Sequence, residues 1–480
     1  MEKKKCVPVP ESAEQAGAVT VSESAGENRG LLRALLFLAL PTVAEEILAT
    51  LLQYVDTAMV GQLGEQATAS VSITTNVTWL VNSVPGAIGT AMLVLISKAL
   101  GAGDERQVRK LSQQALFLAV TAGALLSVAS IGLCPYIPVW MGAEEAIRED
   151  ASRYFFIISL PLIFRCASSV LGAALRAVQN TKTPMLISLA ANAVNIVLNY
   201  LLIYTADLGV AGAAASSAVS YVLSGVLMYR ACRKNRLLTW KWKEFSLEKG
   251  LLRECAVTGL PVLGVSIVSC LGYVVFAGLV SGMGTTVFAA HSIAVTAETI
   301  FYVPGYGLRS AASTLISSAR GEGNMEKLKR TGLIGIFLTI GMMCVSGVLL
   351  YLSARFLMRI FSPAEEVVSL GAEMLRLVAL SEPFFGFMVV LEGIFYGLGR
   401  TRYAFFVETA GMWGVRILFT FLCVRVWDLG LRAVWYCMIA DNVCKALLFA
   451  VPALRILLSG RNHAAASERT GKPERRLSSL

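Results

Sequence analysis

The chain has 480 residues, of which 56% are hydrophobic and only 15% are charged, and its mean hydropathy is +0.65. A soluble globular protein carries about 25% charged residues, so this composition excludes that class. The apolar residues fall in runs of about 20 or more, each long enough to cross a hydrocarbon core of about 30 Å as a helix. The sequence therefore predicts an all-α integral membrane protein.

Glycines, prolines and charge clusters divide the chain into twelve candidate membrane-spanning helices. They lie at 31–58, 67–97, 111–134, 148–176, 184–205, 208–230, 251–281, 286–318, 331–352, 366–397, 403–425 and 431–458. Residues 1–30 are polar and small and lack the apolar core of a signal peptide. We expect a disordered cytoplasmic tail there, and a second one at 459–480.

Lysines and arginines gather in alternate loops. The loops 98–110 and 230–243 are rich in them, whereas 61–67 and 134–146 contain none. The positive-inside rule then places both termini in the cytoplasm of a multi-pass cell-membrane protein. The net charge of +10 follows from this topology and from attraction to anionic lipid, so nucleic-acid binding is not needed to explain it.

The chain also repeats itself at a constant separation. The anchors of the repeat are Pro41 with Pro261, Gly101 with Gly321, and Thr181 with Thr401, and the two positions of each pair differ by 220. The repeat predicts two pseudo-symmetric six-helix lobes, an N-lobe at 31–230 and a C-lobe at 251–458, joined by a cytoplasmic linker at 231–250. An even number of spans in each half makes the repeat parallel, an arrangement typical of transporters that work by alternating access.

The first predicted span carries polar residues at membrane depth. At helical spacing Glu46, Thr50, Gln53 and Thr57 form one stripe, and Asp56 lies on its flank. A carboxylate at this depth is costly unless it faces protein or water, and it marks a functional site by default. The alternative is that the glutamates lie near the membrane surface and Asp56 only bonds a neighbouring helix.

Three asparagines share one face of the fifth predicted span. Asn192, Asn195 and Asn199 lie at i, i+3 and i+7. Carboxylate, amide and hydroxyl oxygens are hard ligands, so Asp56, Asn195 and Asn199 together with Ser217 could hold Na⁺. The alternative is helix packing through hydrogen bonds worth about 0.6–1 kcal/mol each, and for Asn192 the two interpretations are equally favoured.

The predicted C-lobe has its own interior charges, with Glu298 and Arg309 on the eighth span and Glu382 and Glu392 on the tenth. Glu298 and one of the tenth-span glutamates could offer negative charge to a cationic substrate. Pairing of these acids with Arg309 or Arg416 is the equally favoured alternative. Glu298 and Arg309 lie about 16 Å apart along an ideal helix, too far to pair directly.

Several segments occur in an order that resembles the multidrug and toxic compound extrusion (MATE) family. They include LPTVAEEILATLLQYVDTAMVGQLG, LGVAGAAASSAVS and VFAAHSIA, and the similarity runs from Leu31 to Leu458. The resemblance implies two six-helix lobes that export organic cations and other amphipathic small molecules, driven by inward movement of Na⁺ or H⁺. A lipid-linked precursor flippase of the same superfamily is the alternative, and it would carry more cationic residues in its cavity.

The resemblance places four residues in the N-lobe cation site: Asp56, Asn195, Asn199 and Ser217. Asn199 stands where many prokaryotic members have a second aspartate, and Ser217 replaces a threonine. Two acids that form a C-lobe cation site in one branch of the family correspond here to Ser269 and Phe385, which puts such a site in doubt.

The sequence thus predicts a secondary active multidrug exporter with no cofactor beyond Na⁺ or H⁺, acting as a monomer. The residues expected near its substrate are Gln53, Asn192, Glu298, Arg309, Glu382 and Glu392. An enzyme is not expected, because we find no nucleophile, metal cluster or acid–base group near a membrane surface.

Overall fold

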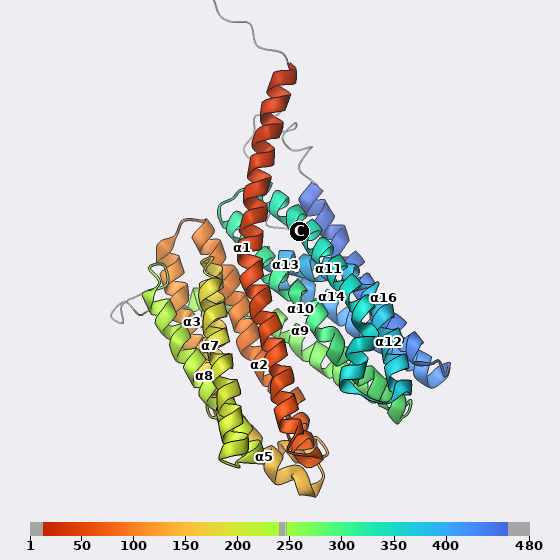
Figure 1. The fold of residues 1–480 in the computed structure, drawn as a ribbon. Helices are drawn as coiled ribbons and strands as arrows, with labels where there is room; N and C mark the ends of the chain where they lie inside the picture. Colours follow the sequence, from red (N-terminus) through yellow and green to blue (C-terminus); the bar gives the residue numbers. More distant parts are fainter. Residues whose placement is uncertain (1–12, 240–244, 246, 459–480) are drawn as a thin grey trace, which may run out of the picture.

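The structure, a computed structural model, describes residues 13–239, 245 and 247–458, and most of them are helical. Figure 1 shows two helical lobes, with α1 lying between them. The N-lobe contains α1 (Ala13–Gly61), α2 (Glu65–Gly101), α3 (Glu105–Leu133), α4 (Ile137–Trp140), α5 (Glu145–Ser159), α6 (Leu162–Ala177), α7 (Lys182–Asn199), the π-helical segment η1 (Tyr200–Thr205) and α8 (Gly209–Lys234). The C-lobe contains α9 (Lys249–Ser281), α10 (Thr285–Gly321), α11 (Met325–Phe361), α12 (Glu365–Ala379), α13 (Glu382–Gly397), α14 (Thr401–Thr409), the π-helical η3 (Ala410–Ile417), α15 (Leu418–Phe421), the π-helical η4 (Leu422–Val426) and α16 (Leu431–Leu458).

Twelve membrane spans are present in the described part of the chain. Ten helical segments are long and apolar enough to cross a membrane, and two further spans are bent pairs, α5 with α6 (51°) and α12 with α13 (54°). Pro161 lies at the first bend, and Pro383 opens α13 after the second. Proline lacks the backbone donor that a regular helix needs, which explains both breaks. The predicted all-α fold of twelve spans in two lobes is confirmed.

The N-terminal part of the chain differs from the sequence prediction. Residues 13–30 continue α1, whereas a disordered tail was expected over 1–30. Forming the first turn is the costly step of helix formation, so a helix already fixed in the lobe extends cheaply through a segment with several alanines and glutamates. Residues 1–12 and the predicted tail at 459–480 lie outside the described residues.

The first helix of each lobe packs against the second helix of the other lobe. In α1, Leu35 and Leu38 form a buried cluster with Leu308 of α10. On the opposite side of the molecule α9 approaches α2 at Gly259, where an added Cβ would lie 3.4 Å from the Cβ of Ala91. The two lobes are therefore held together by two helix contacts along the seam between them, α1 with α10 and α9 with α2.

The C-terminal ends of α2 and α10 meet at two glycines that correspond in the repeat. A Cβ on Gly101 would overlap the backbone carbonyl of Ser318, and a Cβ on Gly321 would overlap that of Lys98. Both helices end here in the basic loops that the sequence analysis placed in the cytoplasm. The lobes are therefore in direct backbone contact at this end of the seam.

This contact predicts a stability effect for Gly101→Leu. A larger side chain must push α2 away from α10, and overpacking of this kind costs about 1–3 kcal/mol. We expect a lower midpoint of thermal unfolding in detergent. Gly132→Leu on α3 is the matched control, because a Cβ there meets nothing within 4 Å. Equal midpoints for both variants would contradict the close helix contact.

Candidate functional site

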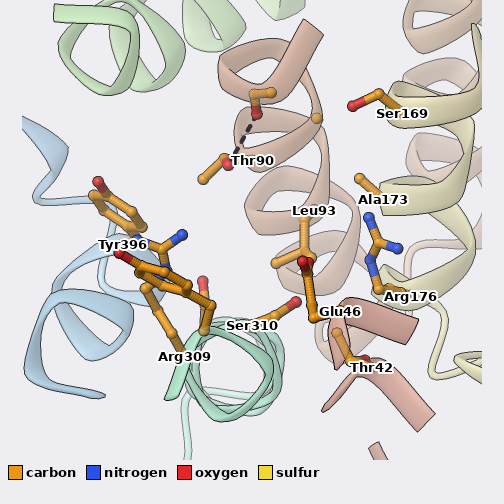
Figure 2. A pocket seen from close by; sticks show the side chains of 14 residues that line it. Thr42, Glu46, Thr90, Leu93, Ser169, Ala173, Arg176, Arg309, Ser310 and Tyr396 are labelled. Carbon is orange, nitrogen blue, oxygen red and sulfur yellow. Dashed lines mark hydrogen bonds between the residues drawn. The ribbon is translucent and has the colours of Figure 1, made fainter. Parts of the chain in front are cut away.

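A cavity of about 200 Å³ lies between the lobes, with walls from α1, α2 and α6 of the N-lobe and α10 and α13 of the C-lobe (Figure 2). The residues that line it are Thr42, Glu46, Gly86, Gly89, Thr90, Leu93, Ser169, Ala173, Arg176, Tyr306, Arg309, Ser310, Ser313 and Tyr396. The polar share of this lining is high for a protein interior, as expected of a site for a charged or hydrogen-bonding ligand.

The lining residues are partners in the internal repeat. The pairs are Gly86 with Tyr306, Gly89 with Arg309, Thr90 with Ser310, Leu93 with Ser313, and Arg176 with Tyr396. Equivalent positions of both halves thus face the same space. The α2 side contributes small residues and the α10 side contributes an arginine and a tyrosine, so the cavity is symmetric in position but not in chemistry.

Both arginines at the cavity are already neutralised. Arg176 Nη1 lies 3.3 Å from Glu45 Oε2, which belongs to α1. In the other lobe Arg309 Nη1 lies 2.8 Å from Glu392 Oε2, and the Tyr396 hydroxyl donates to the second oxygen of that carboxylate over 2.5 Å. Each guanidinium is therefore paired with a carboxylate of the protein.

Glu46 is the carboxylate without such a partner. It is exposed to the cavity between the two arginines (Figure 2), and within the described residues it makes no ion pair. The two arginines are balanced by Glu45 and Glu392. When Glu46 is ionised, these five groups carry a net charge of −1, which favours a cation in the cavity.

The cavity includes only part of the predicted substrate set. Arg309 lines it, and Glu392 acts on it through the Arg309 ion pair, as the pairing alternative stated. The four other predicted residues do not line this cavity: Gln53 is exposed on α1, Asn192 is half-buried on α7, and Glu298 and Glu382 are buried inside the C-lobe. The sequence analysis missed the cavity roles of Glu46 and Arg176, although it placed Glu46 in the polar stripe of the first span.

A second polar site lies inside the N-lobe, where α1, α7 and α8 meet. Asn199 Nδ2 donates to Asp56 Oδ1 over 2.5 Å, and the Ser216 hydroxyl donates to Asn199 Oδ1. Asn195, which neighbours Asn199 on α7, contacts the hydroxyl of Ser217 at 3.4 Å. The structure thus brings together all four residues that the resemblance placed here and adds Ser216, whose only signal in the sequence was the run of small residues around it.

Hydrogen bonds fix the orientation of the Asn195 amide. Its nitrogen donates to both Asp56 oxygens, at 2.9 and 3.2 Å, and its oxygen accepts from the Ser217 backbone N–H at 3.2 Å. Asp56 thus accepts hydrogen bonds from the amides of both Asn195 and Asn199, an arrangement that suits an ionised carboxylate.

Local backbone irregularity positions this site. Directly after Asn199 the chain winds into the π-helical segment η1, and such wide turns are frequent at functional sites. Opposite it, α8 approaches closely at Gly212, where an added Cβ would lie 2.7 Å from the Leu202 carbonyl oxygen. Asn195 and Asn199 are only 3% and 1% exposed, so their amides must find partners within the protein.

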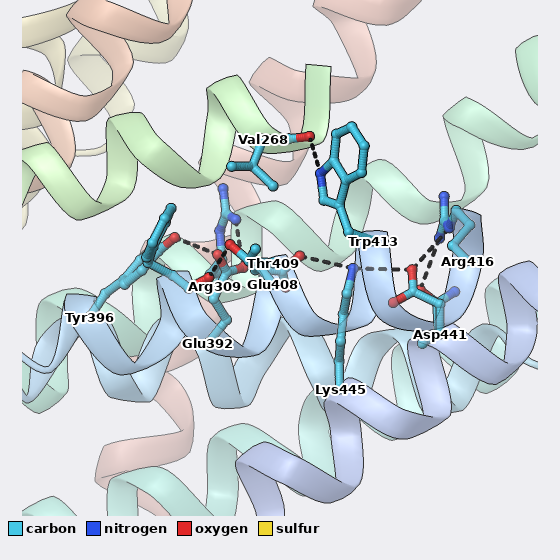
Figure 3. Close-up of polar contacts among 12 residues, drawn as sticks. Val268, Arg309, Glu392, Tyr396, Glu408, Thr409, Trp413, Arg416, Asp441 and Lys445 are labelled. Carbon is cyan, nitrogen blue, oxygen red and sulfur yellow. Dashed lines mark hydrogen bonds and ion pairs between the residues drawn. The ribbon is translucent and has the colours of Figure 1, made fainter. Parts of the chain in front are cut away.

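The C-lobe interior holds a chain of ion pairs (Figure 3). Lys445 Nζ lies 2.9 Å from Glu408 Oε2 and 3.1 Å from Asp441 Oδ2, and Arg416 Nε lies 2.9 Å from the same Asp441 oxygen. All four side chains are at least nine-tenths buried. The two cations and two anions balance, so this group is neutral as a whole.

Comparison with known proteins agrees with this architecture. The family model MatE matches the chain twice, over residues 41–201 and 261–422, which is the internal repeat found in the sequence. Two such six-helix lobes around a shared cavity define a duplicated membrane-transporter fold. The chain belongs to the MatE family of membrane transporters.

Curated relatives cover most of the chain. The probable multidrug resistance protein NorM of Thermotoga maritima is 28% identical over 439 residues, which is 89% of this chain and 92% of that protein. The protein of the same name from Photorhabdus laumondii is 25% identical over 438 residues, with coverage of 88% and 94%. The uncharacterized transporter YisQ of Bacillus subtilis is 20% identical over 402 residues, with coverage of 82% and 88%.

Solved structures share the fold. A multidrug resistance MATE family transporter of the MOP superfamily in an outward-facing conformation superposes with a TM-score of 0.84 at 20% identity, covering 92% of this chain and 97% of that one. A MOP superfamily transporter from Pyrococcus furiosus, described as having reverse polarity of its binding pocket, gives 0.85 at 20% identity, with coverage of 89% and 96%. At this identity the likeness concerns the fold alone.

The buried ion pairs predict a strong effect of Lys445→Met. Removing the shared cation leaves Glu408 without its partner and Asp441 with only one, and breaking a buried pair in this way costs about 3–5 kcal/mol. We expect Lys445→Met to lower the midpoint of thermal unfolding in detergent. Lys249→Met is the control, because Lys249 is exposed at the start of α9, and such a change is worth about 0.5 kcal/mol or less. A Lys445→Met protein as stable as this control would contradict the network.

Proposed function

We propose that the protein is a secondary active exporter of amphipathic organic cations in the cell membrane, with both termini in the cytoplasm. Uptake of one Na⁺ or H⁺ at Asp56 drives the export of one substrate molecule from the cavity. The observation that carries the proposal is the half-buried Asp56 carboxylate, which is held by amides and a hydroxyl network rather than by a cation of the protein. Relatives named as probable multidrug resistance proteins support the substrate class.

The Asp56 site has the chemistry of a reversible cation site. Its carboxylate, amide and hydroxyl oxygens suit a hard monovalent cation. The tight contact between Asn199 and Asp56 also ties α7 to α1. Gain or loss of a cation at this carboxylate therefore changes the forces between two helices of the N-lobe.

The first helix links the two sites. Glu46 faces the cavity and Asp56 lies ten residues further along α1, about 15 Å away at 1.5 Å per residue. Pro41 removes the hydrogen bond to the Phe37 carbonyl, which instead accepts from the Thr181 hydroxyl at 3.4 Å. A helix that lacks one backbone hydrogen bond bends more easily at that point. In this proposal, bending of α1 transmits the effect of ion binding at Asp56 to the cavity.

The alternative, a lipid-linked precursor flippase, would use a cationic cavity to hold phosphate groups. Arg176 and Arg309 are the observation in its favour. Each of them is already paired with a carboxylate, and the unpaired Glu46 leaves the cavity with a negative balance. The charge arrangement therefore supports an exporter of cations over a carrier of anionic lipid.

Asp56→Asn should abolish ion-driven transport. The experiment follows ethidium uptake into everted membrane vesicles, with Na⁺ and pH gradients imposed separately. The native protein should respond to one of these gradients, which identifies the coupling ion, and Asp56→Asn should fall to the level of vesicles without the protein.

Asp104→Asn is the matched control for this substitution. Asp104 caps α3 through the backbone N–H of Gln107, and asparagine caps a helix equally well, so this variant should transport like the native protein. Gradient-driven transport that persists in Asp56→Asn would overturn coupling at this carboxylate.

Glu46→Gln should weaken the binding of cationic substrates. Loss of one charge contact in a partly enclosed cavity is expected to raise KM for ethidium about tenfold, equivalent to about 1.4 kcal/mol. Transport of an uncharged amphipathic dye should change little. The control is Glu144→Gln, an exposed glutamate before α5. An unchanged KM for ethidium, or equal losses for charged and uncharged dyes, would contradict the role of Glu46.

A further inference from the structure

The internal repeat identifies the C-lobe positions that correspond to the N-lobe cation site. Equivalent positions on the first helices differ by 220, and the turns that follow them keep this offset, since Gly64 and Gly284 have φ of 109° and 111°. Asp56 therefore corresponds to Phe276 on α9. The C-lobe has no carboxylate at the position of the proposed coupling residue.

The fifth span of the C-lobe contains one extra residue. The backbone bonds Ala206 N–H to Leu201 and Trp427 N–H to Leu422 are equivalent, and their positions differ by 221. Before the span, at Thr181 and Thr401, the offset is still 220. The family matches agree, because their starts at 41 and 261 keep the first offset and their ends at 201 and 422 have the second.

The extra residue is accommodated by the π-helical segment η3 (Ala410–Ile417), which has no counterpart within α7. A π-helical turn is the usual way to insert one residue into an α-helix. The second wide segment, η4, matches η1 of the N-lobe. The larger offset holds from the last turn of η3, which contains Arg416. With it, Arg416 corresponds to Asn195, and Thr420 corresponds to Asn199.

The contacts of Arg416 agree with this correspondence. Its guanidinium carbon lies 5.9 Å from the ring centre of Phe276, the counterpart of Asp56, and 5.4 Å from that of Tyr273. Its Nε binds Asp441 on α16, the helix that corresponds to α8. Arg416 is only 4% exposed. The guanidinium of Arg416 thus lies at the C-lobe position that corresponds to the Asn195 amide of the N-lobe cation site.

We propose that the guanidinium of Arg416 is a built-in cation that fills, in the C-lobe, the place corresponding to the coupling site of the N-lobe. Asp441 is its counter-anion, and Phe276 and Tyr273 cover it with aromatic faces, which favour a cation. The C-lobe therefore takes up no coupling ion at this place, so of the two corresponding positions only that of Asp56 binds one. The statement about Asp56 rests on its proposed function, whereas the role of Arg416 does not.

Substitution by residues of similar length separates charge from packing. Arg416→Lys keeps a cation beside Asp441, and Arg416→Met keeps the apolar stem without charge. We expect Arg416→Lys to retain transport and a midpoint of thermal unfolding near that of the native protein, and Arg416→Met to lose most of both. Equal behaviour of the two variants would overturn the proposal, because packing alone would then explain the residue.

Chemical rescue tests whether the space left by the Arg416 side chain binds a cation. Arg416→Ala should regain thermal stability when millimolar guanidinium ion is added to the detergent-solubilised protein, whereas choline at the same concentration should have no effect. Arg106→Ala, which alters an exposed arginine at the start of α3, should not respond to either ion. Absence of rescue in an Arg416→Ala protein that still folds would overturn the proposal.

Ion binding to the native protein and to Asp56→Asn then distinguishes the two proposals. If the Arg416 place takes up no ion, any stabilisation of Asp56→Asn by Na⁺ or H⁺ should be unchanged when Asp441→Asn is added. Stabilisation that persists in Asp56→Asn and disappears on adding Asp441→Asn would place a second ion in the C-lobe and overturn this inference. Normal rescue of Arg416→Ala together with unimpaired ion-driven transport by Asp56→Asn would instead overturn only the proposed coupling residue.

Discussion

A charge inside a lipid bilayer must be neutralised or hydrated by the protein around it, and this constraint organises the interior of the molecule. The interior cations of the seam and the C-lobe each lie beside a carboxylate: Arg176 with Glu45, Arg309 with Glu392, and Arg416 and Lys445 with Asp441. Four interior carboxylates in the described part of the chain make no ion pair: Asp56, Glu46, Glu298 and Glu382. Amides surround Asp56 and the cavity surrounds Glu46, so these two are open to a cation that comes from outside the protein. Glu298 and Glu382 are buried inside the C-lobe.

The two halves of the duplicated chain have similar helix arrangements. The residues that differ between corresponding positions give the two lobes different chemistry. At the cavity the N-lobe has Gly89 where the C-lobe has Arg309, and the missing side chain lets α6 approach α2, since an added Cβ would lie 3.3 Å from the Cβ of Ala173. Inside the lobes the relation is reversed, because the N-lobe keeps Asp56 where the C-lobe has Phe276. The two corresponding places thus differ in chemistry, with a carboxylate held by amides in the N-lobe and an arginine paired with Asp441 in the C-lobe.

The sequence predicted the spans well because hydrophobic length, proline and glycine act locally along the chain. It also predicted the Asp56 site, since the spacing of Asn195 and Asn199 fixes a common helix face, and the resemblance joined that face to α1. The cavity could not be derived in this way. Arg176 near the end of its span resembled one more basic loop residue, and its contact with Glu45 depends on how α6 packs against α1. The insertion at η3, which sets the position of Arg416, leaves no mark in hydrophobic periodicity.

In the proposed exchange transport, direct repulsion between substrate and coupling ion would be too weak to drive the cycle. Two unit charges about 15 Å apart interact by about 1 kcal/mol at an effective dielectric constant of about 20, and by less in a hydrated cavity. Shifting a two-state equilibrium from 1:99 to 99:1 requires about 5.5 kcal/mol. The proposal therefore requires contacts that change when α1 moves, and the Asn199–Asp56 bond and the Arg309–Glu392 pair beside Glu46 lie where such changes would occur.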